Sequence, residues 1–213
     1  MTTTETTHGG QDAVAEKIKK IKELYADAPE LGKAALRDGV AALKKEFGLE
    51  EPDRAPAAAT QPRTAGRIGA RRGKLSELTG IMPLVPGGGR RIRGLLEIAD
   101  GNFKGADLVG TLHDMRFVLL NDDTTLLFAT TYDGDWDAYI DDFATKIPHS
   151  MDLLFCNCEG WPGIRSPSIK DWIVARQHPA AGWYVANPNL TVAETRKLEK
   201  IGQAVDELLD KIG

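Results

Sequence analysis

Three aspartates stand close together in the stretch FATTYDGDWDAYIDDF, residues 128–143. Asp133, Asp135 and Asp137 alternate with other residues, which raises the question of a metal site. A calcium loop needs oxygen ligands at several alternate positions and a bidentate carboxylate at its twelfth position, and no glutamate occurs there. Asp135 directly precedes a helical pattern and Asp137 lies in its first turn, where carboxylates cap a helix and favour its dipole. Helix capping is therefore our interpretation, and a metal site is not expected.

A second polar group lies in LHDMRF, residues 112–117. A strand would direct Asp114 and Arg116 to one face and His113 to the other. Charges are costly to bury on an apolar sheet unless they are paired. The two charged residues could line a pocket in which Arg116 binds a carboxylate or a peroxide oxygen, so Arg116, Asp114 and His113 are the candidate catalytic residues. A structural salt bridge across the sheet is the alternative.

Cys156 and Cys158, in CNCEGWPG, are the two cysteines of the chain. A zinc site needs about four ligands, and no second cysteine pair exists. A thiol beside Glu159 could be reactive or ligate haem, which makes Cys158 a candidate cofactor ligand, although buried cysteines more often fill space. The absence of a disulfide framework, with an N-terminus unlike a secretory signal, predicts a cytoplasmic protein.

The bulk composition excludes some classes of protein. The chain has 213 residues, of which 42% are hydrophobic, enough for one domain of ordinary size and an appendage. The net charge of -4 does not favour a nucleic-acid binder. No apolar run approaches the roughly 20 residues that span a bilayer, so no membrane interaction is expected. The glycine-rich turn PGGGRRIR, residues 86–93, matches neither a Walker A loop nor a dinucleotide fingerprint and has only weak potential for anions.

The chain divides into three predicted segments. Residues 1–51 contain a disordered tail to residue 10 and a helical hairpin, and residues 52–73 form a flexible basic linker rich in Pro and Ala. The hairpin carries two narrow apolar stripes, which are Val14, Ile18, Ile21 and Tyr25, and Leu36, Val40, Leu43 and Phe47. Each stripe needs a partner surface on the main domain, a second subunit or another protein. Residues 74–213 form the main domain.

The main domain is predicted to be α+β, with strands and helices in the ferredoxin-like βαββαβ order of an antiparallel sheet. Strands are expected at ELTGIMPLV, LHDMRFVLL, TLLFATTY and GWYVANP, and helices at RRIRGLLEIAD, DWDAYIDDFATKI and SIKDWIVARQH. A closing helix begins at Thr191, which forms a capping box with Glu194. The strand RFVLL is expected at the centre of the sheet. It is apolar on both sides, so the second face needs a cover, and a homodimer would supply it.

The hairpin LHDMRFVLLNDDTTLLFATTYDG and the helix DWDAYIDDFATKIPH resemble the dimeric α/β-barrel superfamily. That superfamily includes cofactor-free and haem-degrading monooxygenases, chlorite dismutases and dye-decolourising peroxidases. In its haem-binding branches an axial histidine lies near the end of this helix, and the resemblance implies that His149 is the haem-iron ligand, with His113, His178 and Cys158 as alternatives. The other interpretation of His149 is a histidine at a helix end, where its proton favours the helix dipole.

Two functions follow as expectations. The first is an oxidoreductase of the dimeric α/β-barrel type, a haem-dependent peroxidase or monooxygenase that acts as a homodimer on a small organic substrate or a peroxide. The second is a non-catalytic dimeric interaction module, whose helical hairpin and basic linker dock a protein or RNA partner.

Overall fold

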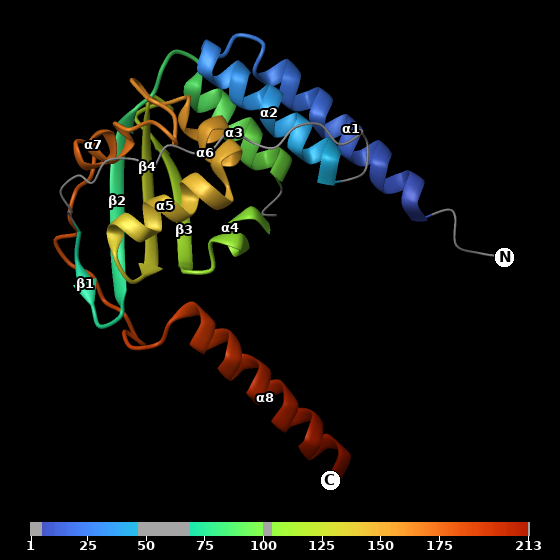
Figure 1. The fold of residues 1–213 in the computed structure, drawn as a ribbon, viewed down its shortest axis with the longest axis vertical. Coiled ribbons are helices and arrows are strands. Elements are labelled where there is room, and N and C mark those ends of the chain that lie inside the picture. The colour runs from blue at the N-terminus through green and yellow to red at the C-terminus, as the bar shows by residue number, and fades with distance from the viewer. Residues whose placement is uncertain (1–5, 47–68, 100–103, 213) are drawn as a thin grey trace.

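The computed structural model describes residues 6–46, 69–99 and 104–212, and their fold is α+β (Figure 1). One open antiparallel sheet has the strand order β1-β2-β4-β3, with β1 at Arg71–Arg72, β2 at Leu75–Pro83, β3 at Leu112–Leu120 and β4 at Thr125–Asp133. Eight helices lie in these ranges: α1 Thr6–Leu24, α2 Glu30–Glu46, α3 Gly88–Ala99, α4 Lys104–Val109, α5 Trp136–Lys146, α6 Pro148–Phe155, α7 Ile169–Val174 and α8 Val192–Ile212. None of them has the length and apolar character needed to cross a membrane.

The predicted hairpin of β3 and β4 is confirmed. Its register places Leu120 opposite Thr125, and three successive residues of the turn, Asn121 to Asp123, have positive φ angles. Asn and Asp tolerate this conformation better than most side chains. The prediction that RFVLL is central is wrong, because β3 lies at the edge and β2 and β4 occupy the centre.

One face of the sheet carries the core. Tyr132 of β4 stacks on Tyr139 of α5, and Phe128 of β4 meets Phe155 of α6 edge to face. Since successive side chains of a strand point to opposite faces, the helices α5 and α6 cover this one face, as Figure 1 shows. The same buried cluster includes Ala28 of the N-terminal hairpin and five residues of its predicted stripes: Ile18, Ile21, Tyr25, Leu36 and Val40. The two helical stripes were therefore predicted correctly at these positions, and the hairpin docks on the main domain.

The opposite face of the sheet carries a row of apolar side chains across three strands. Ile81, Leu127 and Val118 are direct neighbours in the register. Ile81 is 37% exposed and Val118 is 42% exposed, so this row is only partly covered in the single chain. We call it the open-face row. The expectation that a second copy covers it stays a prediction.

The predicted strand GWYVANP, residues 182–188, is wrong. This segment does not join the sheet, and Tyr184 is 87% exposed. The cause lies at the edge of β2 that faces away from β4, where the backbone N–H of Glu77 already bonds to the carbonyl of Ala70. The buried Glu77 carboxylate accepts bonds from the backbone N–H groups of Ala70 and Ala180 at 2.9 and 3.0 Å. The Glu77 side chain thus accepts hydrogen bonds that the backbone of β2 would otherwise have made with a further strand.

Three other boundaries differ from the sequence expectations. Helix α1 begins at Thr6, so the predicted disorder of residues 6–10 is wrong. The segment MDLLF, which is not among the expected helices, belongs to α6. Of the predicted linker, residues 52–68 lie outside the described residues, and Arg71–Arg72 pair with β2 as strand β1.

The predicted capping box at the start of α8 is confirmed. The Glu194 carboxylate accepts a bond from the Thr191 N–H at 2.8 Å, and the Glu194 N–H donates to the Thr191 hydroxyl at 3.2 Å. Lys74, beside β2, donates to both oxygens of the same carboxylate at 2.7 and 2.9 Å. The start of α8 is therefore tied to the sheet as well as capped.

We expect this attachment to weaken in acid. The bonds from Lys74, and then those from Thr191, lower the pKa of Glu194 from its ordinary value of 4.5 to about 2. A carboxyl whose pKa is lower in the folded state stabilises that state above its unfolded pKa, and the effect is lost as the pH falls through the folded pKa. Helix content measured by circular dichroism should therefore fall between about pH 4.5 and 2 in the wild type. Glu194→Gln should lack that step, and identical profiles for the two proteins would contradict the assignment.

Candidate functional site

His149 does not occupy the predicted position at the end of a helix. Helix α5 ends at Lys146, and Pro148 begins the separate helix α6, so His149 lies in the first turn of α6. Proline at the first position breaks the preceding helix and starts the next one. His149 faces α2, since a Cβ placed on Gly39 of α2 would stand 3.8 Å from the His149 Cβ.

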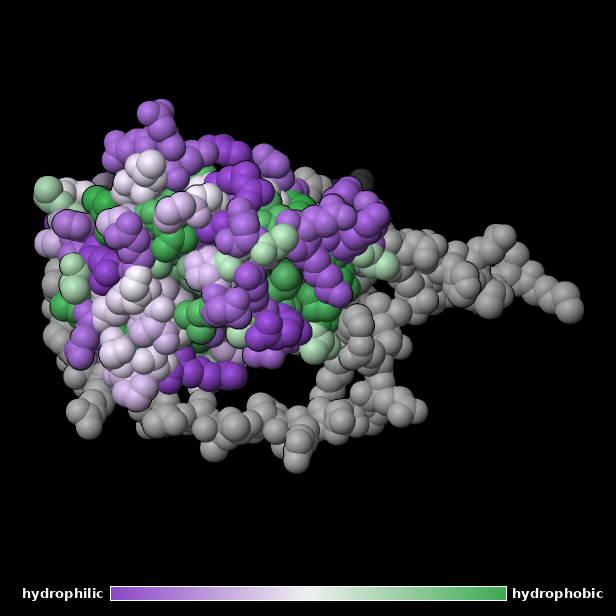
Figure 2. Space-filling view, turned by 90° about the horizontal axis from the view of Figure 1, so that it is seen from above, coloured by the Kyte–Doolittle hydropathy of each residue, from purple (hydrophilic) through white to green (hydrophobic). Residues whose placement is uncertain are grey.

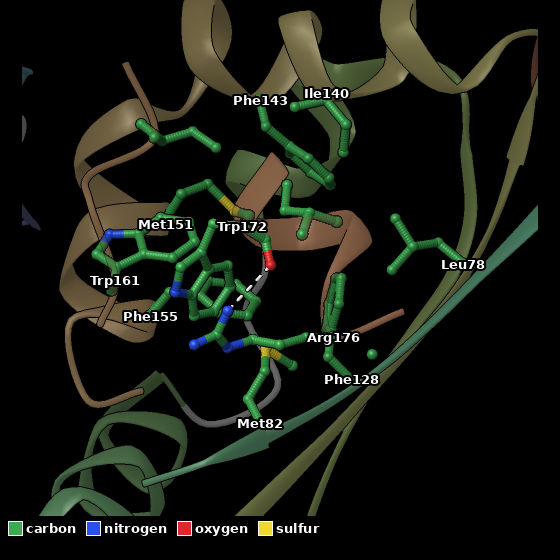
Figure 3. Close-up of a pocket in the computed structure, with 13 residues that line it drawn as sticks. Leu78, Met82, Phe128, Ile140, Phe143, Met151, Phe155, Trp161, Trp172 and Arg176 are labelled. Carbon is green, nitrogen blue, oxygen red and sulfur yellow. Dashed lines mark hydrogen bonds between the residues drawn. The ribbon is translucent and has the colours of Figure 1, made fainter. Parts of the chain in front are cut away.

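A small apolar cavity of about 30 Å³ lies between the sheet and the helices α5, α6 and α7 (Figure 3). Its lining residues are Leu78, Gly80, Met82, Phe128, Ile140, Phe143, Met151, Phe155, Trp161, Ile164, Trp172, Ile173 and Arg176. The Arg176 guanidinium stacks on Trp172, 4.1 Å from the ring centre, and donates to the Trp172 carbonyl at 3.2 Å. This charge is thus held by an aromatic ring and by backbone carbonyls at the edge of the cavity.

The residues around this cavity do not fit a haem group. Ligand pockets typically measure about 300 to 1,000 Å³, whereas a volume near 30 Å³ corresponds to about one water molecule. None of His149, His113 and Cys158 is among the lining residues. The predicted ligands therefore lie in three different places around the core.

His113 is paired with a carboxylate. Its Nε2 lies 2.7 Å from Asp133 Oδ1, and Asp133 Oδ2 accepts a bond from the Val192 N–H at 2.9 Å. Because a carboxylate only accepts, the His113 Nε2 is the donor of this pair. Both bonds converge on the end of β4, so His113 and Asp133 connect the edge strand β3 to the start of α8.

Asp114 and Arg116 pair with each other along β3, and not across the sheet as the alternative to a pocket had it. Arg116 Nε lies 3.2 Å from Asp114 Oδ1, and both side chains are exposed on β3. Exposed pairs of this kind contribute little to stability. The three predicted catalytic residues do not converge, because His113 bonds to Asp133 while the other two face solvent.

The aspartates around the start of α5 bind cations of the protein itself. Asp135 is the N-cap residue of α5, as predicted, but its side chain makes no capping bond and pairs instead with Arg71 at 2.9 Å. Asp137 and Asp141 lie 3.3 and 2.9 Å from the ammonium group of Lys170, whose side chain is 3% exposed. These pairs fasten α7 and β1 to α5. Over the ranges that the structure describes, no group of three or more His, Cys, Asp or Glu side chains is placed to hold a metal ion.

The two cysteines are buried, free thiols. Burial is the main cause that raises the pKa of Cys156 to about 12 and raises the pKa of Cys158 as well. A Cβ on Gly32 of α2 would come within 2.7 Å of the Cys156 sulfur, so this thiol fills the contact between α2 and the end of α6. Both thiols stay protonated at neutral pH, which disfavours nucleophilic or ligand chemistry.

Sequence reasoning missed a buried polar network around Arg91. The Arg91 side chain is 1% exposed and donates to Asn157 Oδ1 at 2.7 Å, to the Pro86 carbonyl at 2.9 Å and to Asp27 at 3.1 Å. Asn157 in turn donates to the Tyr25 hydroxyl at 3.2 Å. The network joins the end of α1, the start of α3 and the loop after α6. The run of arginines in PGGGRRIR marked the position, but no signal in the sequence distinguishes Arg91 from its exposed neighbours.

A surface groove lies between α1 and α2, with a volume of about 440 Å³. Its lining residues are Lys22, Tyr25, Ala26, Lys33, Leu36, Arg37, Val40 and Ala41. Hydrophobic side chains show between hydrophilic ones on this side of the molecule (Figure 2). We call this feature the hairpin groove; it combines three cations with an apolar floor.

Helix α8 extends away from the rest of the molecule (Figure 1). Of its residues, Val192 alone is buried. Six large apolar side chains between residues 198 and 212 are 48% to 71% exposed.

Comparison of the chain with models of protein families, with curated protein sequences and with solved structures found no match.

Proposed function

We propose that the protein is an interaction module that docks an acidic amphipathic helix of a partner protein in the hairpin groove. The observation that carries this proposal is the pairing of an apolar floor with the cations Lys22, Lys33 and Arg37 in one groove of about 440 Å³. Helix-in-groove recognition uses apolar anchors at helical spacing, and complementary charge sets orientation and partner choice.

The groove is supported by a rigid base. Tyr25, which lines it, donates its hydroxyl to the Leu153 carbonyl at 2.8 Å, and Arg91 holds Asp27 at the end of α1. Leu36 and Val40 belong to the main core cluster. A partner would therefore bind a preformed surface and lose less conformational entropy on binding than with a mobile hairpin.

The charges of the groove give the test. We expect Lys33→Glu/Arg37→Glu to weaken binding of a synthetic helix, with leucines on one face and glutamates beside them, by about tenfold or more, because like charges then meet. Fluorescence anisotropy of the labelled peptide on the full chain would measure it.

The matched control is Lys17→Glu/Lys19→Glu, which makes the same charge change at exposed positions of α1 outside the groove. Equal losses in both double variants would mean that the peptide senses only net charge. Absence of binding to the wild type, at concentrations where the peptide is helical, would overturn the proposal.

We also propose that the core is ferredoxin-like. The order β2-β4-β3 is that of the first three strands of the fold. Residues 176–178 run along the edge of β2 that faces away from β4, where Ile81 donates to the Arg176 carbonyl at 3.0 Å. The oxidoreductase implied by the resemblance stays a prediction, and a visible absorption spectrum of the purified protein would test its haem-dependent form.

A further inference from the structure

Helix α8 carries its apolar residues at a regular spacing. They are Leu198, Ile201, Val205, Leu208, Leu209 and Ile212. Steps of three, four, three and four residues separate Leu198, Ile201, Val205, Leu208 and Ile212, which is the a and d spacing of a heptad. We call these six residues the α8 stripe. A stripe of this width ordinarily faces a core. Its exposure on α8 therefore indicates that a partner surface is missing.

We propose that the α8 stripe pairs with the α8 stripe of a second copy, with the two helices antiparallel. The spacing fits another helix better than a flat surface, because a and d side chains insert between the side chains of a facing helix. This surface lies apart from the hairpin groove and does not depend on the proposed function.

The charges of α8 favour the antiparallel arrangement. Its first half contains the cations Arg196, Lys197 and Lys200, and its second half contains the anions Asp206, Glu207 and Asp210. Counting Glu194 and Glu199 in the first half and Lys211 in the second, the halves carry +1 and -2. Antiparallel pairing around Val205 sets Lys200 of one copy beside Asp210 of the other and Glu199 beside Lys211, whereas parallel pairing sets identical charges together.

The contacts that hold the start of α8 allow two α8 helices to pair over so short a stripe. The stripe extends over 15 residues, or about 21 Å of helix, which is marginal for an isolated pair. Here the first turn is already formed, because Glu194 bonds to Lys74 and Thr191, and Asp133 accepts from the Val192 N–H. Part of the entropic cost of starting the helix is therefore met within each chain.

The mass of the full-length protein in sedimentation equilibrium tests the pairing. The wild type should be a dimer at micromolar concentration, and Val205→Glu/Leu208→Glu should raise the dimer dissociation constant about 100-fold or more, because two charges per chain would enter an apolar contact. Ala193→Glu/Gln203→Glu adds the same charge at exposed positions off the stripe and should leave the dimer intact. A monomeric wild type, or equal effects of the two double variants, would overturn the proposal.

Further variants separate the other possible surfaces. Dissociation by Val118→Glu, with the stripe variant still dimeric, would assign the dimer to the open-face row instead. Dissociation by Lys33→Glu/Arg37→Glu to the same extent as by the stripe variant would place α8 in the hairpin groove of another copy. Both results would overturn the pairing of two α8 helices, whereas loss of peptide binding in a dimer that persists would leave it standing.

Engineered cysteines give the orientation. In the antiparallel pair, Leu198 of one copy lies beside Ile212 of the other, so Leu198→Cys/Ile212→Cys should form disulfide-linked dimers on oxidation, and Leu198→Cys alone should not. Cross-linking of the single variant would show a parallel pair and contradict the proposal. The native thiols do not interfere, because Cys156 and Cys158 are buried.

Discussion

Replacing Arg91 by methionine is expected to lower the free energy of unfolding by about 2 to 4 kcal/mol. The change keeps much of the side-chain volume but leaves the buried Asn157 Oδ1 and the Pro86 carbonyl without their donor, and each orphaned buried acceptor costs about 1 to 3 kcal/mol. The bond to Asp27 adds less, since that carboxylate is largely exposed and can be hydrated. Urea unfolding monitored by tryptophan fluorescence measures the change.

Arg93→Met is the matched control for this prediction. Arg93 lies two residues further along α3 and pairs with Asp123 at 2.7 Å, and both partners are more than a third exposed. Its replacement should change stability by about 1 kcal/mol or less. Similar losses for both arginines would show that Arg91 contributes as an ordinary surface cation.

Replacing Tyr139 by alanine is expected to destabilise the fold by about 3 to 5 kcal/mol, the usual cost of removing a large aromatic residue from a core. Tyr139 is buried, stacks on Tyr132 with ring centres 3.8 Å apart and meets Phe143 edge to face at 4.6 Å. Its hydroxyl lies 2.6 Å from the Thr130 hydroxyl. The substitution therefore empties the contact between α5 and the centre of the sheet.

Two variants divide this effect into its parts. Tyr139→Phe keeps the ring and removes the hydroxyl, so it should cost only about 1 to 2 kcal/mol from the unpaired Thr130. Tyr184→Ala, at a tyrosine that is 87% exposed, should change stability by about 0.5 kcal/mol or less. A loss in Tyr139→Phe as large as in Tyr139→Ala would mean that the bond, and not the ring packing, holds α5.

Local patterns predicted the local structure well. The alternation in LHDMRFVLL and TLLFATTY and the polar turn between them fixed both strands and their pairing, because all the necessary signals lie within 22 residues. The capping box of Thr191 and Glu194 was found in the same way. The stripes of α1 and α2 also predicted which side of the hairpin is buried, although they did not identify the main domain as the surface on which it packs.

Predictions failed where distant residues decide the structure. The pattern GWYVANP has strand character, but the edge of β2 is taken by residues 69–72, by residues 176–178 and by the carboxylate of Glu77. Arg91 and its partner Asn157 are 66 positions apart, and nothing near either residue signals a buried arginine. The resemblance predicted that His149 lies at the end of a helix. Pro148 instead begins the separate helix α6, so His149 lies in the first turn of α6.

The docking of the hairpin also imposes an order on synthesis. Tyr25 and Asn157, which bond to each other in the core, are 132 positions apart. A ribosome adds roughly 5 to 20 residues per second, so about 7 to 26 seconds pass between the emergence of Tyr25 and that of its partner. During this interval the side of α2 that packs on α6 is uncovered, because α6 has not been made. The nascent chain therefore exposes the hairpin to chaperones and to other nascent chains until the loop after α6 leaves the ribosome.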